Sequence, residues 1–151
     1  MTEREHAGVA RWERRWLSIS GLMSLVFVIL IAYSLATEGA HIAQRSGRTT
    51  PDQLTANPLF AEPGVRIMAP NQFQVTAVAQ AFAFSPAEIR LPVGAEVDFF
   101  LTSRDVIHGF QIQDTNVNVE VLPGEISYLH YKFDDVGEFR LTCNDYCGIS
   151  H

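Results

Sequence analysis

Two cysteines and a histidine stand four residues apart in Cys143-Asn144-Asp145-Tyr146-Cys147-Gly148-Ile149-Ser150-His151. Cys143 and Cys147 are the only two cysteines among the 151 residues. Thiolate sulfur and imidazole nitrogen are ligands that copper and zinc prefer in proteins. The spacing therefore predicts a metal site in a short loop. Three ligands so close in sequence seldom complete a site, so a fourth is expected from elsewhere in the chain.

His108 is the candidate for that fourth ligand. It lies in Ser103-Arg104-Asp105-Val106-Ile107-His108-Gly109-Phe110, a predicted turn between two strands with apolar residues around it. A lone histidine in such a place is more often structural, but the Cys/Cys/His cluster downstream favours the ligand interpretation. His130 alternates with core positions on a predicted strand and is expected to be exposed.

Three other interpretations use the same residues. The two cysteines could form a disulfide in an oxidising compartment, although a disulfide leaves His108 and His151 unexplained. Zinc bound by two cysteines and two histidines needs the same ligand set. A mononuclear blue-copper site needs a single cysteine, so the second cysteine argues against it.

The N-terminal part of the chain predicts a membrane anchor. Residues 1–15 are polar, and the 20 residues from Leu17 to Ala36 carry no charge. A helix rises 1.5 Å per residue, so this stretch can cross a hydrocarbon core about 30 Å thick. We therefore predict a transmembrane helix over residues 16–37, with Trp12 and Trp16 in an interfacial belt.

The distribution of basic residues predicts the orientation of that anchor. Arginines 11, 14 and 15 precede the apolar stretch, and the next basic residue is Arg45. The positive-inside rule then places the N-terminus in the cytoplasm and the rest of the chain outside the plasma membrane. The alternative is a secretory signal peptide cleaved after Ser34-Leu35-Ala36, but its apolar region would be unusually long. Both interpretations deliver the C-terminal part to the outside.

The charge of the part beyond the anchor bears on its partners. The whole chain has a formal net charge of −6. Four arginines and three glutamates within residues 1–37 give that segment +1, so the remainder carries −7. An acidic exterior argues against nucleic acid as a partner and favours a basic protein.

Residues 38–70 are expected to form a linker. Thr49-Thr50-Pro51-Asp52 interrupts regular structure, and Pro58, Pro63 and Pro70 follow it. The part up to about Arg48 could continue the helix out of the membrane. The rest is expected to be an extended connector laid on a surface rather than an independent fold.

Residues 71–151 predict a small β domain. Apolar and polar residues alternate over 73–79, 97–102, 117–121, 129–133 and 139–142. Turn residues separate these stretches, as at Pro92-Val93-Gly94 and Pro123-Gly124. Short alternating strands between regular turns are typical of an antiparallel sandwich or barrel. Six phenylalanines, Phe82, Phe84, Phe99, Phe110, Phe133 and Phe139, are expected mostly in its core.

Several of these motifs occur together in a known family. Cys-x3-Cys-x3-His, preceded by Asp-Val-x-His-Gly-Phe and Val-Glu-Val-Leu-Pro-Gly-Glu, resembles the CuA domain of cytochrome c oxidase subunit II. The single N-terminal anchor resembles subunit II of the B-type heme-copper oxidases. The resemblance covers essentially the whole chain and implies a mainly β, cupredoxin-like Greek-key barrel after one transmembrane helix.

The resemblance also implies a ligand set. In it, Cys143 and Cys147 bridge two copper ions of a binuclear CuA centre, and His108 and His151 each bind one of them. The backbone carbonyl of Asp145 is a weak axial ligand, and the Asp145 side chain is a candidate for a magnesium ion at the interface with the large subunit.

This sequence departs from the family at its end. The family carries a methionine ligand three residues after the second histidine and then a last strand, whereas the sequence ends at His151. Met1, Met23 and Met68 do not match that position. As written, the chain is expected to hold an incomplete site and an incomplete barrel.

The function implied by the resemblance is electron entry into a terminal oxidase. The chain would accept electrons from a c-type cytochrome or a small copper protein and pass them to the heme of subunit I, which reduces oxygen. Two alternatives remain open at this point. One is a module that binds or delivers copper, and the other is the CuA subunit of a nitric oxide or nitrous oxide reductase.

Overall fold

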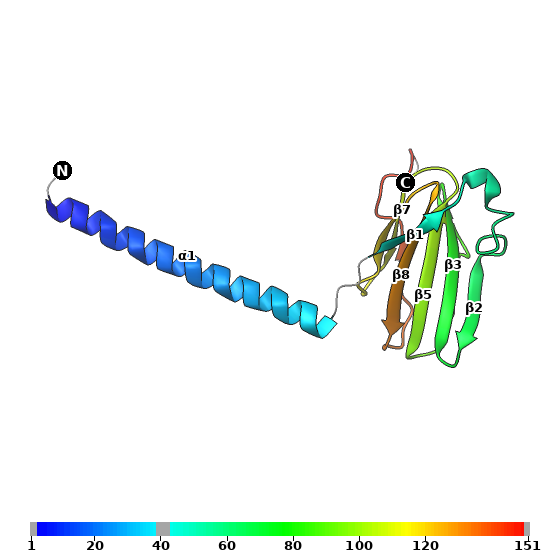
Figure 1. The fold of residues 1–151 in the computed structure, drawn as a ribbon, viewed down its shortest axis with the longest axis horizontal. Coiled ribbons are helices and arrows are strands. Elements are labelled where there is room, and N and C mark those ends of the chain that lie inside the picture. Colours follow the sequence, from blue (N-terminus) through cyan, green and yellow to red (C-terminus); the bar gives the residue numbers. More distant parts are fainter. Residues whose placement is uncertain (1–2, 39–42, 150–151) are drawn as a thin grey trace. The chain divides into compact units, whose positions relative to one another are not determined.

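The computed structural model describes residues 3–38 and 43–149 (Figure 1). The chain divides into two compact units, a helical one within residues 1–40 and a β one within residues 41–151. The helical unit is α1, Glu3–Glu38. Its stretch Arg11–Thr37 contains an 18-residue window with a mean hydropathy of 2.3 and is long and apolar enough to cross a membrane.

The larger sheet of the β unit has six strands. Five run side by side in the order β1-β8-β5-β3-β2, and β4 pairs with β3 (Figure 1). All pairings in this sheet are antiparallel except β3 with β5, which is parallel. The strands are β1 (Gln44–Arg48), β2 (Gly64–Ala69), β3 (Gln72–Gln80), β4 (Ala83–Ser85), β5 (Ala95–Ser103) and β8 (Glu125–Phe133).

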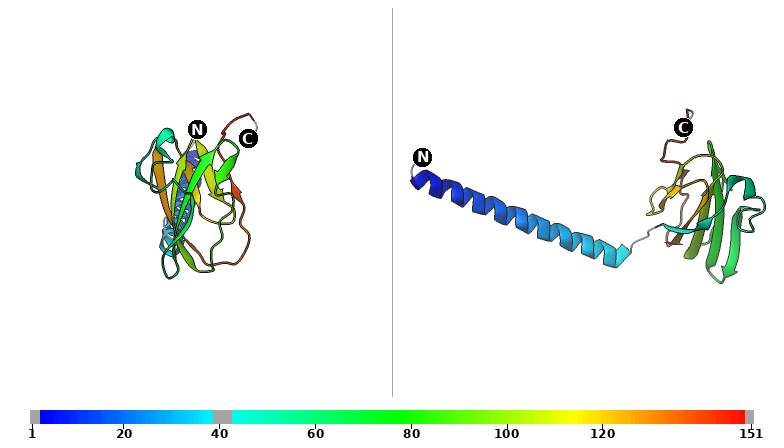
Figure 2. Two further views of the ribbon diagram at one scale, coloured as in Figure 1. Left: turned by 90° about the vertical axis from the view of Figure 1, so that its right-hand side faces the viewer. Right: turned by 45° about the horizontal axis from the view of Figure 1, so that its top comes forward.

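A second sheet has three strands in the order β7-β6-β9. They are β6 (His108–Ile112), β7 (Asn118–Val121) and β9 (Leu141–Thr142). The two sheets form the layers of a sandwich (Figure 2). Its main core lies between them, where Phe99 of β5 and Phe110 of β6 have ring centroids 5.8 Å apart. The prediction of a mainly β, cupredoxin-like domain after one apolar helix is confirmed.

The alternating pattern of the sequence accounts for this core. Along β5 the buried side chains Ala95, Val97, Phe99 and Leu101 alternate with less buried ones, because successive side chains of a strand point to opposite faces. The predicted turn glycines Gly94 and Gly124 have φ of 77° and 88°. Side chains with a Cβ adopt this left-handed region only at a cost, so glycine suits both turns.

The segment expected to be a linker belongs to the β unit. β1 and β2 lie within residues 38–70, and so does a short 3₁₀ helix, Pro51–Gln53. Leu54 and Phe60 pack against Val78 and Ile126, on the face of the larger sheet that points away from the main core. The expected connector thus lies on the surface of the larger sheet, and it also contains the strands β1 and β2, which the sequence analysis did not predict.

The expectation that the helix continues to about Arg48 is wrong. α1 ends at Glu38, and β1 pairs with β8 from Gln44 to Arg48. The Nε atom of Arg45 lies 2.8 Å from Oε2 of Glu125. Because β1 is polar and exposed along its whole length, its conformation is determined by its backbone pairing with β8.

Phe82 is the exception among the phenylalanines expected in the core. Its side chain is 61% exposed, and its φ is 67°. It lies in the turn between β3 and β4. Phe99 and Phe110 are fully buried, as expected.

Candidate metal centre

Strand register brings the C-terminal loop to the start of β6. In the β6–β9 pair, Thr142 lies opposite Gln111 and Leu141 lies opposite Ile112. The strands are antiparallel, so the chain beyond Thr142 runs back toward Gly109 and His108. Residues 35 positions apart in the sequence meet at this end of the sandwich, where β6 begins and β9 ends.

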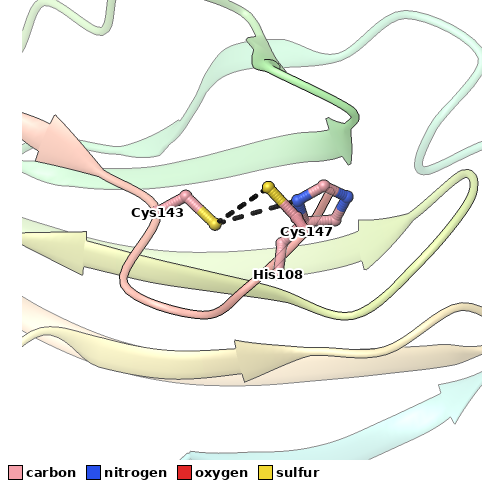
Figure 3. A group of neighbouring side chains, drawn as sticks. All are labelled: His108, Cys143 and Cys147. Carbon is pink, nitrogen blue, oxygen red and sulfur yellow. Dashed lines mark hydrogen bonds between the residues drawn. The ribbon is translucent and has the colours of Figure 1, made fainter. Parts of the chain in front are cut away.

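His108, Cys143 and Cys147 form one cluster (Figure 3). The ligand atoms of the three side chains all lie within 4.8 Å of one another. The Cys143 sulfur is 3.9 Å from Nδ1 of His108 and 3.7 Å from the Cys147 sulfur. His108 is the first residue of β6 and is buried, so it lies at the strand end rather than in the preceding turn. This donor set of sulfur and nitrogen fits copper or zinc.

The two cysteines are not joined by a disulfide in this structure. Their sulfurs are 3.7 Å apart, whereas a disulfide bond is about 2.05 Å long. The disulfide interpretation is therefore not the arrangement found here, and both sulfurs face the histidine nitrogen.

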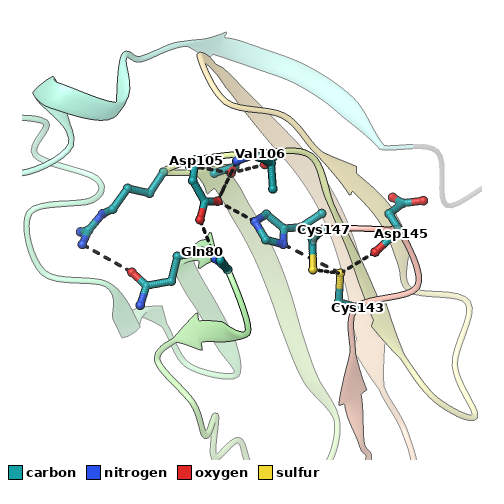
Figure 4. Close-up of polar contacts among 10 residues, drawn as sticks. Gln80, Asp105, Val106, Cys143, Asp145 and Cys147 are labelled. Carbon is teal, nitrogen blue, oxygen red and sulfur yellow. Dashed lines mark hydrogen bonds and ion pairs between the residues drawn. The ribbon is translucent and has the colours of Figure 1, made fainter. Parts of the chain in front are cut away.

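Asp105 orients the His108 ring (Figure 4). Its Oδ1 lies 2.8 Å from Nε2 of His108. With the Nε2 proton donated to Asp105, Nδ1 keeps its lone pair on the side of the sulfurs, as a metal-binding histidine requires. Burial raises the pKa of Asp105, but hydrogen bonds from His108 and from the amides of Ala81 and Val106 outweigh it, so the pKa lies below its ordinary value.

Cys147 is the more buried of the two thiols. Burial raises the pKa of this thiol, and the neighbouring Cys143 raises it further. The backbone amides of Phe82 and of Cys147 itself act in the opposite direction. A cation at the cluster would favour the thiolate, because a metal deprotonates the thiols that bind it.

Of the two other predicted site residues, Asp145 and His151, the structure describes Asp145. The backbone carbonyl oxygen of Asp145 is 3.3 Å from the Cys143 sulfur, so this carbonyl faces the cluster. The Asp145 carboxylate points away from the sulfurs (Figure 4). His151 lies outside the described residues. The structure thus brings together four of the five predicted groups, one of them through its backbone.

Gly109 permits the close approach of the cysteine loop to β6. A Cβ atom at this position would lie 1.8 Å from Oδ1 and 2.9 Å from the backbone nitrogen of Asn144. The Asn144 side chain in turn donates from Nδ2 to Oδ1 of Asn118 at 3.1 Å. Gly109 and Asp105 were not among the predicted site residues. Their positions beside His108 in the motif Asp-Val-Ile-His-Gly were the only available signal.

We expect Gly109→Ala to displace the cysteine loop. The added methyl group overlaps Asn144, including its backbone, so the loop must move. Such overpacking costs about 1–3 kcal/mol of unfolding free energy, and we expect copper affinity to fall at least about tenfold because a ligand on the loop is displaced. Equilibrium unfolding and copper titration of the full chain in detergent measure both effects.

Gly64→Ala is the matched control, because a Cβ at Gly64 meets nothing within 4 Å. It should leave both the unfolding free energy and copper affinity close to those of the unmodified chain. Equal behaviour of the two variants would show that Gly109 does not determine the loop position.

Comparisons with known proteins identify the family. Residues 67–151 match the family model described as cytochrome c oxidase subunit II, periplasmic domain. The chain is 43% identical over 150 residues to a cytochrome c oxidase subunit 2 of Thermus thermophilus, covering 97% of this chain and 89% of that one. A second Thermus thermophilus subunit 2 is 44% identical over 124 residues, covering 80% and 92%.

A solved structure agrees with these relatives. The chain resembles one from a cryo-EM structure of a heme-copper terminal oxidase dimer, with a TM-score of 0.71, 28% identity and 92% coverage of both chains. A periplasmic-domain family preceded by one apolar helix fits a single-pass membrane protein. The chain therefore belongs to the cytochrome c oxidase subunit II family, whose members are components of heme-copper oxidases and so of oxidoreductase complexes.

Proposed function

We propose that this chain is the electron-entry subunit of a terminal oxidase, with a binuclear CuA centre at His108, Cys143 and Cys147. Family membership implies copper and a large catalytic partner subunit. The observation that carries the proposal is the meeting of one oriented imidazole and two cysteine thiols, which are not joined by a disulfide, within 4.8 Å. A single cysteine would suit a mononuclear copper site, whereas two sulfurs can each bridge a pair of ions.

Each ligand has a distinct part in this proposal. The Cys143 and Cys147 thiolates would hold the copper, together with Nδ1 of His108. The backbone carbonyl of Asp145, which faces the Cys143 sulfur, would be a further and weaker ligand, and His151 would supply the second imidazole. When bound, the copper would supply one-electron redox chemistry at these ligands. The Asp145 carboxylate remains our candidate for a magnesium ion at the interface with the large subunit.

The protein's own contribution is to hold these ligands in place. Burial of His108 keeps water from competing for its ring nitrogen, and Asp105 fixes the ring orientation. The Asn144–Asn118 hydrogen bond holds the loop to β7. Rigidly held ligand atoms move little when the charge at the centre changes. This favours electron transfer over the chemical transformation of a substrate.

The proposed donor is a c-type cytochrome or a small copper protein outside the membrane. This orientation follows from the arginines before the apolar stretch of α1, which place the N-terminus in the cytoplasm. The part beyond the anchor carries a formal net charge of −7, so its field would attract a basic donor. Electrons would then pass to the heme of the large subunit, where oxygen is reduced.

Copper titration of the chain in detergent, extended by a C-terminal segment that carries the family's methionine ligand, tests the proposal. We expect a purple product with two coppers for each chain, and an EPR signal whose hyperfine splitting shows one electron shared equally by two nuclei. A colourless product with a single bound metal would point to zinc, and a product with no metal and oxidised cysteines to a disulfide. Either result would remove the electron-transfer function.

A further inference from the structure

The turn between β3 and β4 lines the metal cluster. Gln80, Phe82 and Ala83 contribute to the wall of a cavity that also includes His108, Cys143 and Cys147. Phe82 adopts a φ of 67°, which is uncommon for a residue with a side chain and persists only where surrounding contacts hold it. The turn therefore requires a partner that fixes its backbone.

Asp105 is that partner (Figure 4). Its Oδ2 accepts a hydrogen bond from the backbone amide of Ala81 at 2.6 Å. Its Oδ1 accepts from Nε2 of His108 at 2.8 Å and from the amide of Val106 at 2.7 Å. A backbone hydrogen bond joins the same two segments, because the Arg104 amide donates to the Ala79 carbonyl at 2.9 Å. One carboxylate thus joins the turn to the histidine ring.

The next residue of the turn faces the other ligands. Phe82 and Cys147 line the same cavity. The Phe82 ring lies over the loop beyond Cys147, since a Cβ at Gly148 would be 3.5 Å from Cζ of Phe82. Fixing the Ala81 amide therefore also fixes the amide and the ring that follow it, beside Cys147.

We propose that Asp105 is a positioning residue that acts on both sides of the metal centre. Its Oδ1 sets the orientation of the His108 ring, and its Oδ2 holds the β3–β4 turn against the Cys147 side of the cluster. The copper part of this inference rests on the proposed function, whereas the attachment of the turn to Asp105 does not depend on metal.

Asp98 supplies a matched control. Its Oδ1 also accepts from a histidine, His130 Nδ1 at 2.9 Å, and from the Tyr128 hydroxyl at 2.8 Å. The two aspartates have similar side-chain exposure, 45% for Asp98 and 35% for Asp105. Asp98 lies on the outer face of the larger sheet, away from the described metal ligands. The same substitution there also removes a carboxylate that accepts a hydrogen bond from a histidine, but it leaves the metal cluster untouched.

The first test uses the metal-free, reduced full chain in detergent and measures hydrogen exchange. We expect Asp105→Ala to speed exchange in the peptide covering residues 80–84 about tenfold, with β5 and β8 unchanged, and Asp98→Ala to leave that peptide unchanged. Asp105→Asn keeps the shape of the side chain but replaces one acceptor oxygen by a donor, so it should give an intermediate rate. Unchanged exchange in both Asp105 variants, or a loss of protection that spreads over β5 and β8, would overturn the positioning role.

The second test measures copper release to a chelator from the loaded chain. Loss of a partner that orients a ligand typically costs 10–100-fold in metal affinity. We expect release to be at least about tenfold faster for Asp105→Ala, intermediate for Asp105→Asn, and unchanged for Asp98→Ala. Equal release from the Asp105 and Asp98 variants would overturn the inference. If the unmodified chain binds no copper, the proposed function fails, and the exchange measurement alone decides the role of Asp105.

Discussion

Cys147→Ser is expected to abolish the binuclear copper spectrum. A serine hydroxyl stays protonated near neutral pH and is a harder ligand than a thiolate, so it cannot bridge two coppers as sulfur does. We expect the purple absorption to fall to less than about a tenth of its original intensity, and the shared-electron EPR signal to disappear. Copper titration followed by both spectroscopies on the full chain measures this result.

A matched variant separates ligand loss from the introduction of a serine. Ile149→Ser places the same side chain two residues further along the loop, where the isoleucine is 99% exposed. That variant should keep both spectra. If Cys147→Ser also left the visible spectrum intact, Cys147 would not be a bridging thiolate and the binuclear assignment would fail.

His108→Ala is expected to weaken copper retention by at least about a hundredfold. The substitution removes the only imidazole that the described residues bring to the cluster, and it leaves Asp105 without its ring partner. Because His108 is buried, the substitution also opens a cavity in the protein. Dialysis against a chelator, followed by measurement of the amount of copper still bound to each chain, gives the retention.

His130→Ala is the corresponding control. His130 is exposed and pairs with Asp98 on the outer face of the larger sheet. An exposed pair of this kind is worth about 0.2–1 kcal/mol, so we expect copper retention within about twofold of the unmodified chain. Added imidazole should partly restore copper to His108→Ala by filling its cavity. Equal losses in the two variants would rule out His108 as the upstream ligand.

The sequence predicted the elements with strong periodic signals. The uncharged stretch of α1 and the alternating stretches of β3, β5 and β8 all occur where hydrophobic spacing places them. β1 was missed because Gln44–Arg48 is polar and exposed along its whole length. An edge strand of this type is stabilised by backbone hydrogen bonds to its neighbour, and those bonds leave no apolar pattern to detect.

The sequence also determined which residue types could bind metal. The spacing of Cys143 and Cys147 fixed two soft ligands in one short loop, and the histidine between two strands supplied the third. These assignments depend on side-chain chemistry and local spacing, which the sequence contains directly.

Only the tertiary structure decided how these ligands are held. The antiparallel register of β6 and β9 brings Cys143 to His108, and the missing side chain of Gly109 lets Asn144 approach β6. The carboxylate of Asp105 reaches the ring of His108 and the amide of Ala81, which comes from a turn 24 residues away. Such contacts depend on which strands become neighbours, because hydrogen bonds act over about 3 Å whatever the separation in sequence.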